Sequence, residues 1–155
     1  MSRVLTSKAI AFIVLLAVTV LSAACATAPT QEMSDARQSL QAARDAGAEK
    51  YARENLRAAD DYLKQAEREL ELRYFGRARH DAILARSEAQ KARTVAVTIR
   101  EAMAAIEALE DSGGKQPQAR AALQEAIEAA DDGKDKSAIR LAIKAKRIAE
   151  GEASE

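Results

Sequence analysis

The small and apolar residues of stretch 77–109 recur at alternating steps of four and three positions, and no Pro or Gly interrupts them. This spacing keeps them on one face of an α-helix. The stripe consists of Ala78, Ala82, Ala85, Ala89, Ala92, Ala96, Ile99, Met103 and Ile106. Alanine has the best helix propensity, and its small side chain lets a neighbouring helix approach closely. The pattern therefore predicts a long, tightly packed helix of about 50 Å at 1.5 Å per residue.

Shorter stripes predict two helices before this one and two after it. The first, over residues 31–46, has its stripe at Met33, Ala36, Leu40 and Ala43. The second, over residues 52–73, has its stripe at Leu56, Ala59, Leu63, Ala66 and Leu70. The last two helices are expected over residues 117–130 and 136–150.

Glycine and proline mark the connections between these helices. Gly47 is expected to end the first helix, and Gly76 to supply the positive φ of a tight turn into the long helix. The stretch 111–117 contains two Gly and one Pro and is the clearest break in the chain. A further turn is expected at residues 131–135, which contain Gly133.

An internal repeat supports this map. A shift of 60 residues places eight small or apolar residues of the second and third helices on identical residues of the fourth and fifth, and Gly76 and Gly133 fall in corresponding turns, offset by three. Each helix–turn–helix unit would bury its stripe against its neighbour. The alternative is that any Ala-rich heptad pattern aligns with itself. The pairs are Ala59 and Ala119, Leu63 and Leu123, Ala66 and Ala126, Ala78 and Ala138, Ala82 and Ala142, Ile83 and Ile143, Ala85 and Ala145, and Ala89 and Ala149.

Composition favours long helices over a mixed α/β core, because the chain is rich in Ala and in charge, contains no Trp and has only 3% aromatic residues. The predicted fold is all-α: elongated antiparallel helical hairpins with one long central helix, after an N-terminal signal peptide. We expect a three-helix region at 31–111 and a C-terminal helical hairpin at 117–150.

The first 24 residues are typical of an export signal. Arg3 and Lys8 form a basic start, residues 9–20 are apolar, and residues 21–24 are mostly small. The alternative is a membrane-spanning helix, but the uncharged run is shorter than the ~20 residues that a span needs. We therefore expect the segment to be removed on export.

Cys25 is the only cysteine in the chain and directly follows Ala23 and Ala24. Residues 21–25, Leu-Ser-Ala-Ala-Cys, resemble the lipobox of bacterial lipoproteins, although Ser22 stands where that family usually has Leu. The resemblance implies cleavage before Cys25, acylation of its sulfur, and a lipidated linker over residues 25–30. Ala26, rather than the Asp that often retains such proteins at the inner membrane, favours the outer membrane. Ordinary signal cleavage, leaving a soluble periplasmic protein, is the competing interpretation.

The region after the linker resembles the bacterial lipoprotein family called domain of unknown function 4398. The resemblance covers about residues 28–97 and rests on Ala-Gly at 46–47, Tyr-Ala at 51–52, the Leu/Ala helix that follows, and the Ala-x3-Ala-x2-Ala helix at 78–89. Arg53 stands where the family often has Pro. The family has no settled activity, so the resemblance implies a location in the cell envelope more than a function.

Charge argues against nucleic-acid binding. Subtracting Arg3 and Lys8 from the 24 basic residues leaves the mature chain with a net charge of −2 against its 24 acidic residues. Candidate chemistry is sparse: we find no phosphate loop, no catalytic triad, no Cys/His metal spacing and no sign of a cofactor. The acid pairs at 60–61 and 131–132 are read as solvated, since adjacent helical side chains diverge.

One cluster carries a sharper hypothesis. His80, the only histidine, follows two aromatic residues and three arginines at the tip of the second and third helices. Arg73, Arg77, Arg79 and His80 are candidates to bind an anion of the envelope, such as a lipid phosphate or a peptide-stem carboxylate. The alternative is a solvated basic helix start.

Together these features predict a non-enzymatic, outer-membrane-anchored periplasmic lipoprotein that acts as a helical scaffold or protein-interaction module. Its expected partners are the membrane, through the anchor, and an envelope protein or peptidoglycan; self-association through long helical faces is also expected. The alternative is a binding or carrier module for an anionic or apolar envelope ligand.

Overall fold

The computed structural model describes residues 27–109 and 116–151, and within them all regular structure is helical. The elements are α2 (Thr30–Asp45), α3 (Ala48–Tyr51), α4 (Arg53–Glu71), α5 (Phe75–Glu107), α6 (Gln116–Asp131) and α7 (Asp135–Ala149). The predicted all-α fold with one long central helix is confirmed. The predicted signal segment, Cys25 and most of the predicted break at 111–117 lie outside the described residues.

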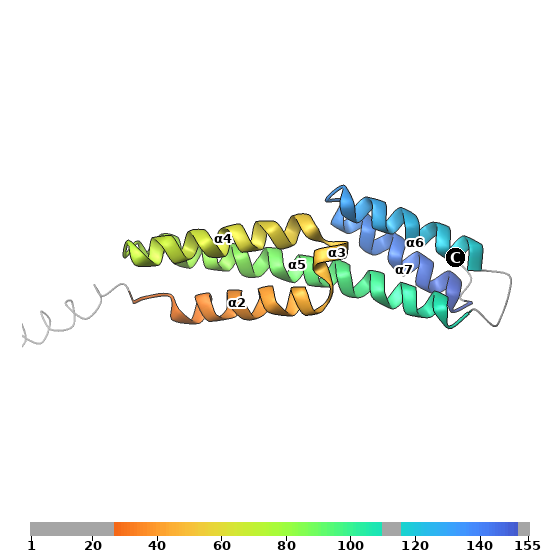
Figure 1. Ribbon diagram of the computed structural model, residues 1–155, viewed down its shortest axis with the longest axis horizontal. Coiled ribbons are helices and arrows are strands. Elements are labelled where there is room, and N and C mark those ends of the chain that lie inside the picture. The colour runs from red at the N-terminus through yellow and green to blue at the C-terminus, as the bar shows by residue number, and fades with distance from the viewer. Residues whose placement is uncertain (1–26, 110–115, 152–155) are drawn as a thin grey trace, which may run out of the picture.

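The helices form two bundles that share α5 (Figure 1). Helices α2 and α4 pack against its first half, and α6 and α7 against its second half. The C-terminal hairpin therefore docks on the long helix instead of standing apart from it. Because one 33-residue helix runs through both bundles, the molecule is elongated along the axis of α5.

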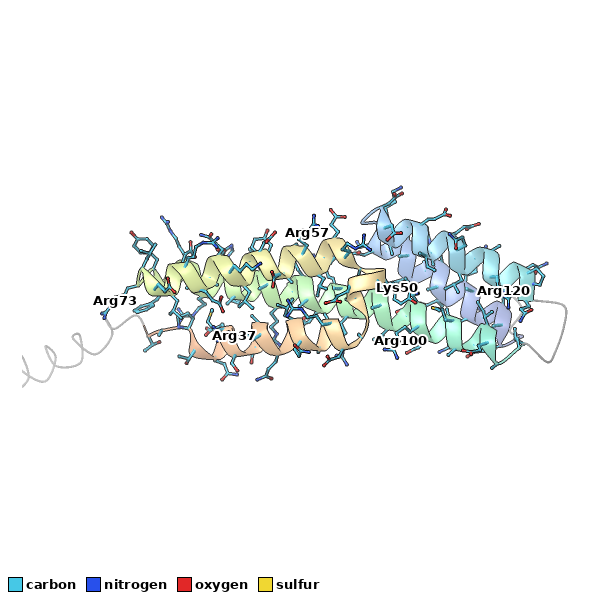
Figure 2. The ribbon with its side chains drawn as sticks, in the orientation of Figure 1. Arg37, Lys50, Arg57, Arg73, Arg100 and Arg120 are labelled. Atoms are coloured by element: carbon cyan, nitrogen blue, oxygen red, sulfur yellow. The ribbon has the colours of Figure 1, made fainter. Side chains whose placement is uncertain are left out.

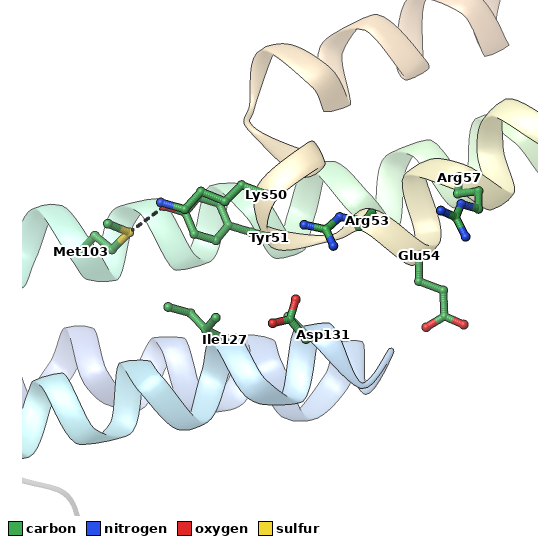
Figure 3. Close-up of a pocket in the computed structure, with 9 residues that line it drawn as sticks. Lys50, Tyr51, Arg53, Glu54, Arg57, Met103, Ile127 and Asp131 are labelled. Atoms are coloured by element: carbon green, nitrogen blue, oxygen red, sulfur yellow. Dashed lines mark hydrogen bonds between the residues drawn. The ribbon is translucent and has the colours of Figure 1, made fainter.

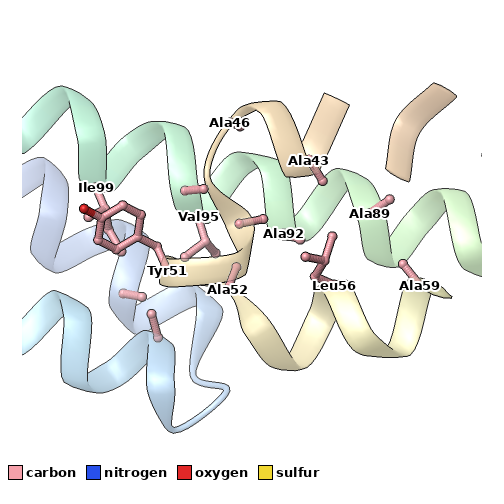
Figure 4. Close-up of a cluster of buried hydrophobic side chains, with 14 of the residues drawn as sticks. Ala43, Ala46, Tyr51, Ala52, Leu56, Ala59, Ala89, Ala92, Val95 and Ile99 are labelled. Atoms are coloured by element: carbon pink, nitrogen blue, oxygen red, sulfur yellow. The ribbon is translucent and has the colours of Figure 1, made fainter. Parts of the chain in front are cut away.

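Alanine makes up most of the core. The buried faces form one continuous cluster that runs from Met33 on α2 to Ala149 on α7, and Figure 4 shows its middle, where Tyr51 packs near Val95 and Ile99. The small side chains at the seams allow close helix–helix packing but bury little area each. The stripes predicted for the first two helices are buried, apart from Leu70, which is partly exposed.

The stripe predicted for the long helix is wrong at one position. Met103 is 37% exposed, whereas Ala102 and Val95 are buried in its place. A strict seven-residue stripe drifts by about 20° per heptad around a straight helix. In addition, α6 and α7 cover a different side of α5 from α2 and α4, so the buried face shifts by one position near Val95.

The turn between α4 and α5 also differs from the expectation. Gly76 lies inside α5, and the positive φ, 59°, belongs to Arg73. The Arg73 N–H donates to the Leu70 carbonyl (3.0 Å) and the Tyr74 N–H to the Glu69 carbonyl (2.8 Å), which closes a Schellman-type helix end. Glycine is the usual residue at such a position, and here arginine occupies it.

The α6–α7 turn has the same geometry 60 residues later. Gly133 has φ 70° and takes the place of Arg73. Its N–H donates to the Ala130 carbonyl (3.1 Å), and the Lys134 N–H donates to the Ala129 carbonyl (2.8 Å). The two turns are thus related by the predicted 60-residue shift without the offset of three that pairing Gly76 with Gly133 required.

The repeat extends beyond the turns. In the first bundle α2 packs beside the α4–α5 hairpin, and in the second the C-terminal half of α5 packs beside the α6–α7 hairpin. Arg86 of α5 pairs with Asp35 (3.2 Å), and Lys146, 60 residues later, pairs with Glu101 (3.1 Å). The same third-helix role and the same kind of ion pair recur, so the predicted repetition is a property of the fold.

A short helix that the sequence did not predict joins the two bundles. Gly47, with φ 85°, ends α2 as expected, and α3 follows it for a single turn. Ala52, with φ −152° and ψ 45°, then separates α3 from α4. This turn brings Tyr51 into the core where the bundles meet (Figure 4).

Candidate functional site

The turn between α4 and α5 forms one end of the molecule. Leu72 and Tyr74 are 62% and 52% exposed, and Arg73, Arg77 and His80 are exposed around them. We call these five residues the α4–α5 tip. Figure 2 shows Arg73 at this end and Arg120 toward the opposite one. The tip therefore presents cations and apolar surface together, away from the body of the bundle.

The four predicted anion-binding residues do not all remain on this surface. The Arg77 guanidinium lies 5.4 Å from the Tyr74 ring centroid. Arg79 instead turns to α2, where its Nε donates to Glu32 Oε1 (2.7 Å), and its Nη2 donates to the Thr27 carbonyl (3.2 Å). A backbone N–H and then Arg79 lower the pKa of Glu32. Anion binding at the tip stays a prediction, with Arg73, Arg77 and His80 as its exposed residues.

Two carboxyl groups meet behind the tip. Glu69 is only 7% exposed, and its Oε2 has no hydrogen-bond partner among the described residues, while its Oε1 accepts from Gln65 (3.2 Å). Burial raises the pKa of Asp81, and the neighbouring charge of Glu69 raises it further. A proton on Asp81 would supply the donor that Glu69 lacks. The pair therefore favours a shared proton.

The acid pairs noted in the sequence do not form sites. Asp60 pairs with Arg44 (3.1 Å) and with Lys64, and Asp132 pairs with Lys134 (2.8 Å). Within residues 27–109 and 116–151, no group of three His, Cys, Asp or Glu side chains is placed to hold a metal ion. These acids belong to ordinary ion pairs of the kind that contributes little stability.

A second surface, the junction groove, lies where the two bundles meet (Figure 3). It is an open hollow of about 710 Å³ between α3, the start of α4, α5 and α6. Three of its residues are cations that follow one another along α3 and α4. The lining consists of Lys50, Tyr51, Arg53, Glu54, Arg57, Met103, Ile127, Ala130 and Asp131.

The floor of the groove is held by specific contacts. The Tyr51 hydroxyl donates to Met103 Sδ (3.2 Å), and Lys50 Nζ lies 4.9 Å from the Tyr51 ring centroid. Nearby, Asn55 Nδ2 donates to Asp135 Oδ2 (2.8 Å), which ties α4 to the start of α7. Sequence reasoning missed this groove, because it depends on α6 lying across α3. The spacing of Lys50, Arg53 and Arg57 was the one signal available.

A third surface, the α7 outer face, combines cations with isoleucine. Ile143 is 45% exposed at its centre, and a shallow hollow of about 330 Å³ follows the helix. Ile83, the residue 60 positions earlier, is similarly exposed at 51%. The face consists of Lys136, Ile139, Arg140, Ile143, Lys144, Arg147 and Ile148.

A sequence model of the family described as Domain of unknown function (DUF4398) matches residues 31–108. No curated protein and no solved structure matches the chain. The match includes α2 to α5 and extends past residue 97, where the sequence resemblance ended, so only the α6–α7 hairpin lies beyond it. None of the helices in the described ranges is both long enough and apolar enough to cross a bilayer.

Proposed function

This chain belongs to the DUF4398 family, a domain of unknown function, and we propose that it is a non-enzymatic lipoprotein that serves as a helical scaffold of the bacterial envelope. In this proposal one end is tethered to the outer membrane at Cys25, and the other end projects into the periplasm. The family match covers the tethered bundle and leaves the α6–α7 hairpin as this chain's own extension.

The anchor is supported by the lipobox-like sequence at residues 21–25. Each buried CH₂ of an acyl chain contributes roughly 0.8 kcal/mol, and stable anchoring takes more than one chain. Mass spectrometry of the mature N-terminus tests it: an acylated Cys25 is expected. An unmodified N-terminus at another residue would exclude the anchor.

The scaffold role rests on one observation, the continuous core along α5. That helix has 33 residues, which is about 50 Å at 1.5 Å per residue. The buried cluster is unbroken from α2 to α7, so no hinge separates the bundles at the level of the core. A rod of this kind suits a protein that holds a partner at a fixed distance from a membrane.

The α7 outer face is the surface we assign to that partner. Its isoleucines give apolar contact area, and its cations select an acidic envelope protein. A photoreactive amino acid at position 143 tests this in intact cells, and position 83 is the matched control, because Ile83 is as exposed and lies 60 residues earlier in the equivalent hairpin. We expect a discrete protein adduct from position 143 only. Equal adducts from both positions, or none, would contradict the assignment.

A second function, carriage of an anionic envelope ligand, is favoured by the junction groove. Lys50, Arg53 and Arg57 line one side of an open, charged hollow. Peptidoglycan stem peptides and lipopolysaccharide are the probes, measured by calorimetry against the intact chain. Binding that is lost on Arg57→Gln but kept on Arg37→Gln, which removes an exposed arginine of α2, would favour the carrier over the scaffold.

A further inference from the structure

We propose that the α4–α5 tip is a membrane-contact surface, seated in the headgroup layer of the same phospholipid bilayer that holds Cys25. The proposal rests on the lipid anchor described above and adds a second, non-covalent contact to it. It gives the exposed Leu72 and Tyr74 a role, and it assigns the cations around them to lipid phosphates.

Chain connectivity places the tip beside the anchor. Cys25 precedes Thr27 by two residues, which span at most about 7 Å. The Thr27 carbonyl accepts a hydrogen bond from Arg79 Nη2 (3.2 Å), and Glu32 holds the same guanidinium (2.7 Å). Arg79 lies four residues after α5 begins, about 6 Å along the helix axis. A bilayer that holds the acylated cysteine therefore lies within a few ångströms of the tip.

The chemistry of the tip suits a bilayer interface. Tyrosine is enriched at membrane–water boundaries because its ring is apolar and its hydroxyl is polar. Arginine binds phosphate oxygens in a bidentate manner, and its alkyl chain lies against apolar surface. Leu72 is the most exposed large apolar residue among those described at this end of the molecule. Apolar and cationic side chains are thus displayed together at one point.

The internal repeat provides a comparison that removes the structural explanation. The α6–α7 turn has the same hydrogen bonds and the same positive φ, and it is built from Asp132, Gly133 and Lys134. The fold therefore requires neither an apolar residue before this position nor an aromatic residue after it. Leu72 and Tyr74 stand at the turn next to the chain start, whereas the turn at the junction carries polar residues.

A bilayer fits the tip better than a protein does. A stable protein interface buries about 800 Å² on each partner, from 20–30 residues. The tip offers five residues at the end of a helical hairpin, too few for such an interface. A lipid surface needs no matching shape, and it is already held in place by the anchor.

Tryptophan fluorescence tests the contact directly, because the natural chain contains no Trp. Tyr74→Trp places a reporter at the tip, and Lys134→Trp places one at the equivalent position of the polar turn. Each full-length, lipidated protein is reconstituted into vesicles of phosphatidylethanolamine and phosphatidylglycerol with or without bromine on the acyl chains. At a depth of about 5–10 Å the reporter of the Tyr74→Trp variant meets bromine, so we expect roughly a twofold loss of its fluorescence. The reporter of the Lys134→Trp variant is expected to keep its intensity.

Flotation of the vesicles separates the two proposals. If the protein does not float with them, the lipid anchor fails and the tip contact fails with it. If it floats but the two reporters respond alike, the anchor stands and the tip contact is overturned. Circular dichroism checks that Tyr74→Trp is folded, and Leu72→Trp replaces it as the reporter if it is not, with the same expected quenching.

Discussion

The two hairpin turns allow one residue position to be tested in two surroundings. Arg73 and Gly133 both have a left-handed backbone, with φ of 59° and 70°. A side chain in this region costs roughly 1–2 kcal/mol, while glycine returns about 0.4–1 kcal/mol through the entropy of the unfolded chain. Arg73→Gly is therefore expected to raise the free energy of unfolding by about 0.5–1 kcal/mol.

The reverse change at the second turn is expected to destabilise the protein. Gly133→Ala introduces the left-handed cost, and its Cβ would overlap the carboxylate of Glu54, which must move. We expect a loss of about 1 kcal/mol or more. Gly76→Ala is the control: Gly76 lies inside α5 with nothing near a new Cβ, so alanine should add about 0.5 kcal/mol through helix propensity.

Urea unfolding followed by far-ultraviolet circular dichroism measures all three variants. A change of 1 kcal/mol corresponds to a shift of about 3–5 °C in Tm for a chain of this size, which thermal melts resolve. The decisive result is the pair of signs for the two glycines, loss at Gly133 and gain at Gly76. If both alanine variants gain stability, or if Arg73→Gly loses it, the account of the turns is wrong.

Three further outcomes follow from the packing and the charges. Ala89→Leu should cost about 1–3 kcal/mol in urea unfolding by overpacking the seam, whereas Ala104→Leu on the exposed side of α5 should be near neutral. Asp81→Asn should raise Tm at neutral pH, because the raised pKa of Asp81 means that its charge opposes folding; the advantage should fade as the pH drops through that raised pKa toward the ordinary value of 3.8, and an advantage that grew at low pH would contradict the assignment. Asn55→Ala should cost about 1–2 kcal/mol by removing the 2.8 Å hydrogen bond to the start of α7, and unchanged stability would argue that this link is not formed in solution.

The regular spacing of small residues was sufficient to predict the helices. Each stripe needs a partner to bury it, and antiparallel neighbours joined by short turns are the simplest way to supply one. Gly47 ended α2 as predicted because glycine had no competing role there. Gly76 misled because composition cannot show that the positive φ falls on Arg73, three residues earlier. Met103 misled because the side of α5 that is covered changes between the bundles.

The surfaces were predictable only in part. The cations of the α4–α5 tip follow directly from the sequence around Arg73 and Arg77, because a turn between two helices exposes its residues. The pairing of Arg79 with Glu32 depends on where α2 packs, and α2 begins 49 residues earlier. The junction groove depends on three helices from both bundles and a single-turn helix at Tyr51. No local pattern reports such an arrangement.

The repeat also explains why two turns of one shape carry different residues. At the second turn the Glu54 carboxylate lies against Gly133, so packing and backbone both require glycine there. At the first turn nothing packs against Arg73, so only the backbone favours glycine, and that preference amounts to about 0.5–1 kcal/mol. A cost of that size can be retained if the side chain binds something outside the protein. Arg73→Gly should therefore stabilise the fold and at the same time weaken the contact between the tip and the vesicle; if it stabilises the fold and leaves bromine quenching of the Tyr74→Trp reporter unchanged, Arg73 has no part in that contact.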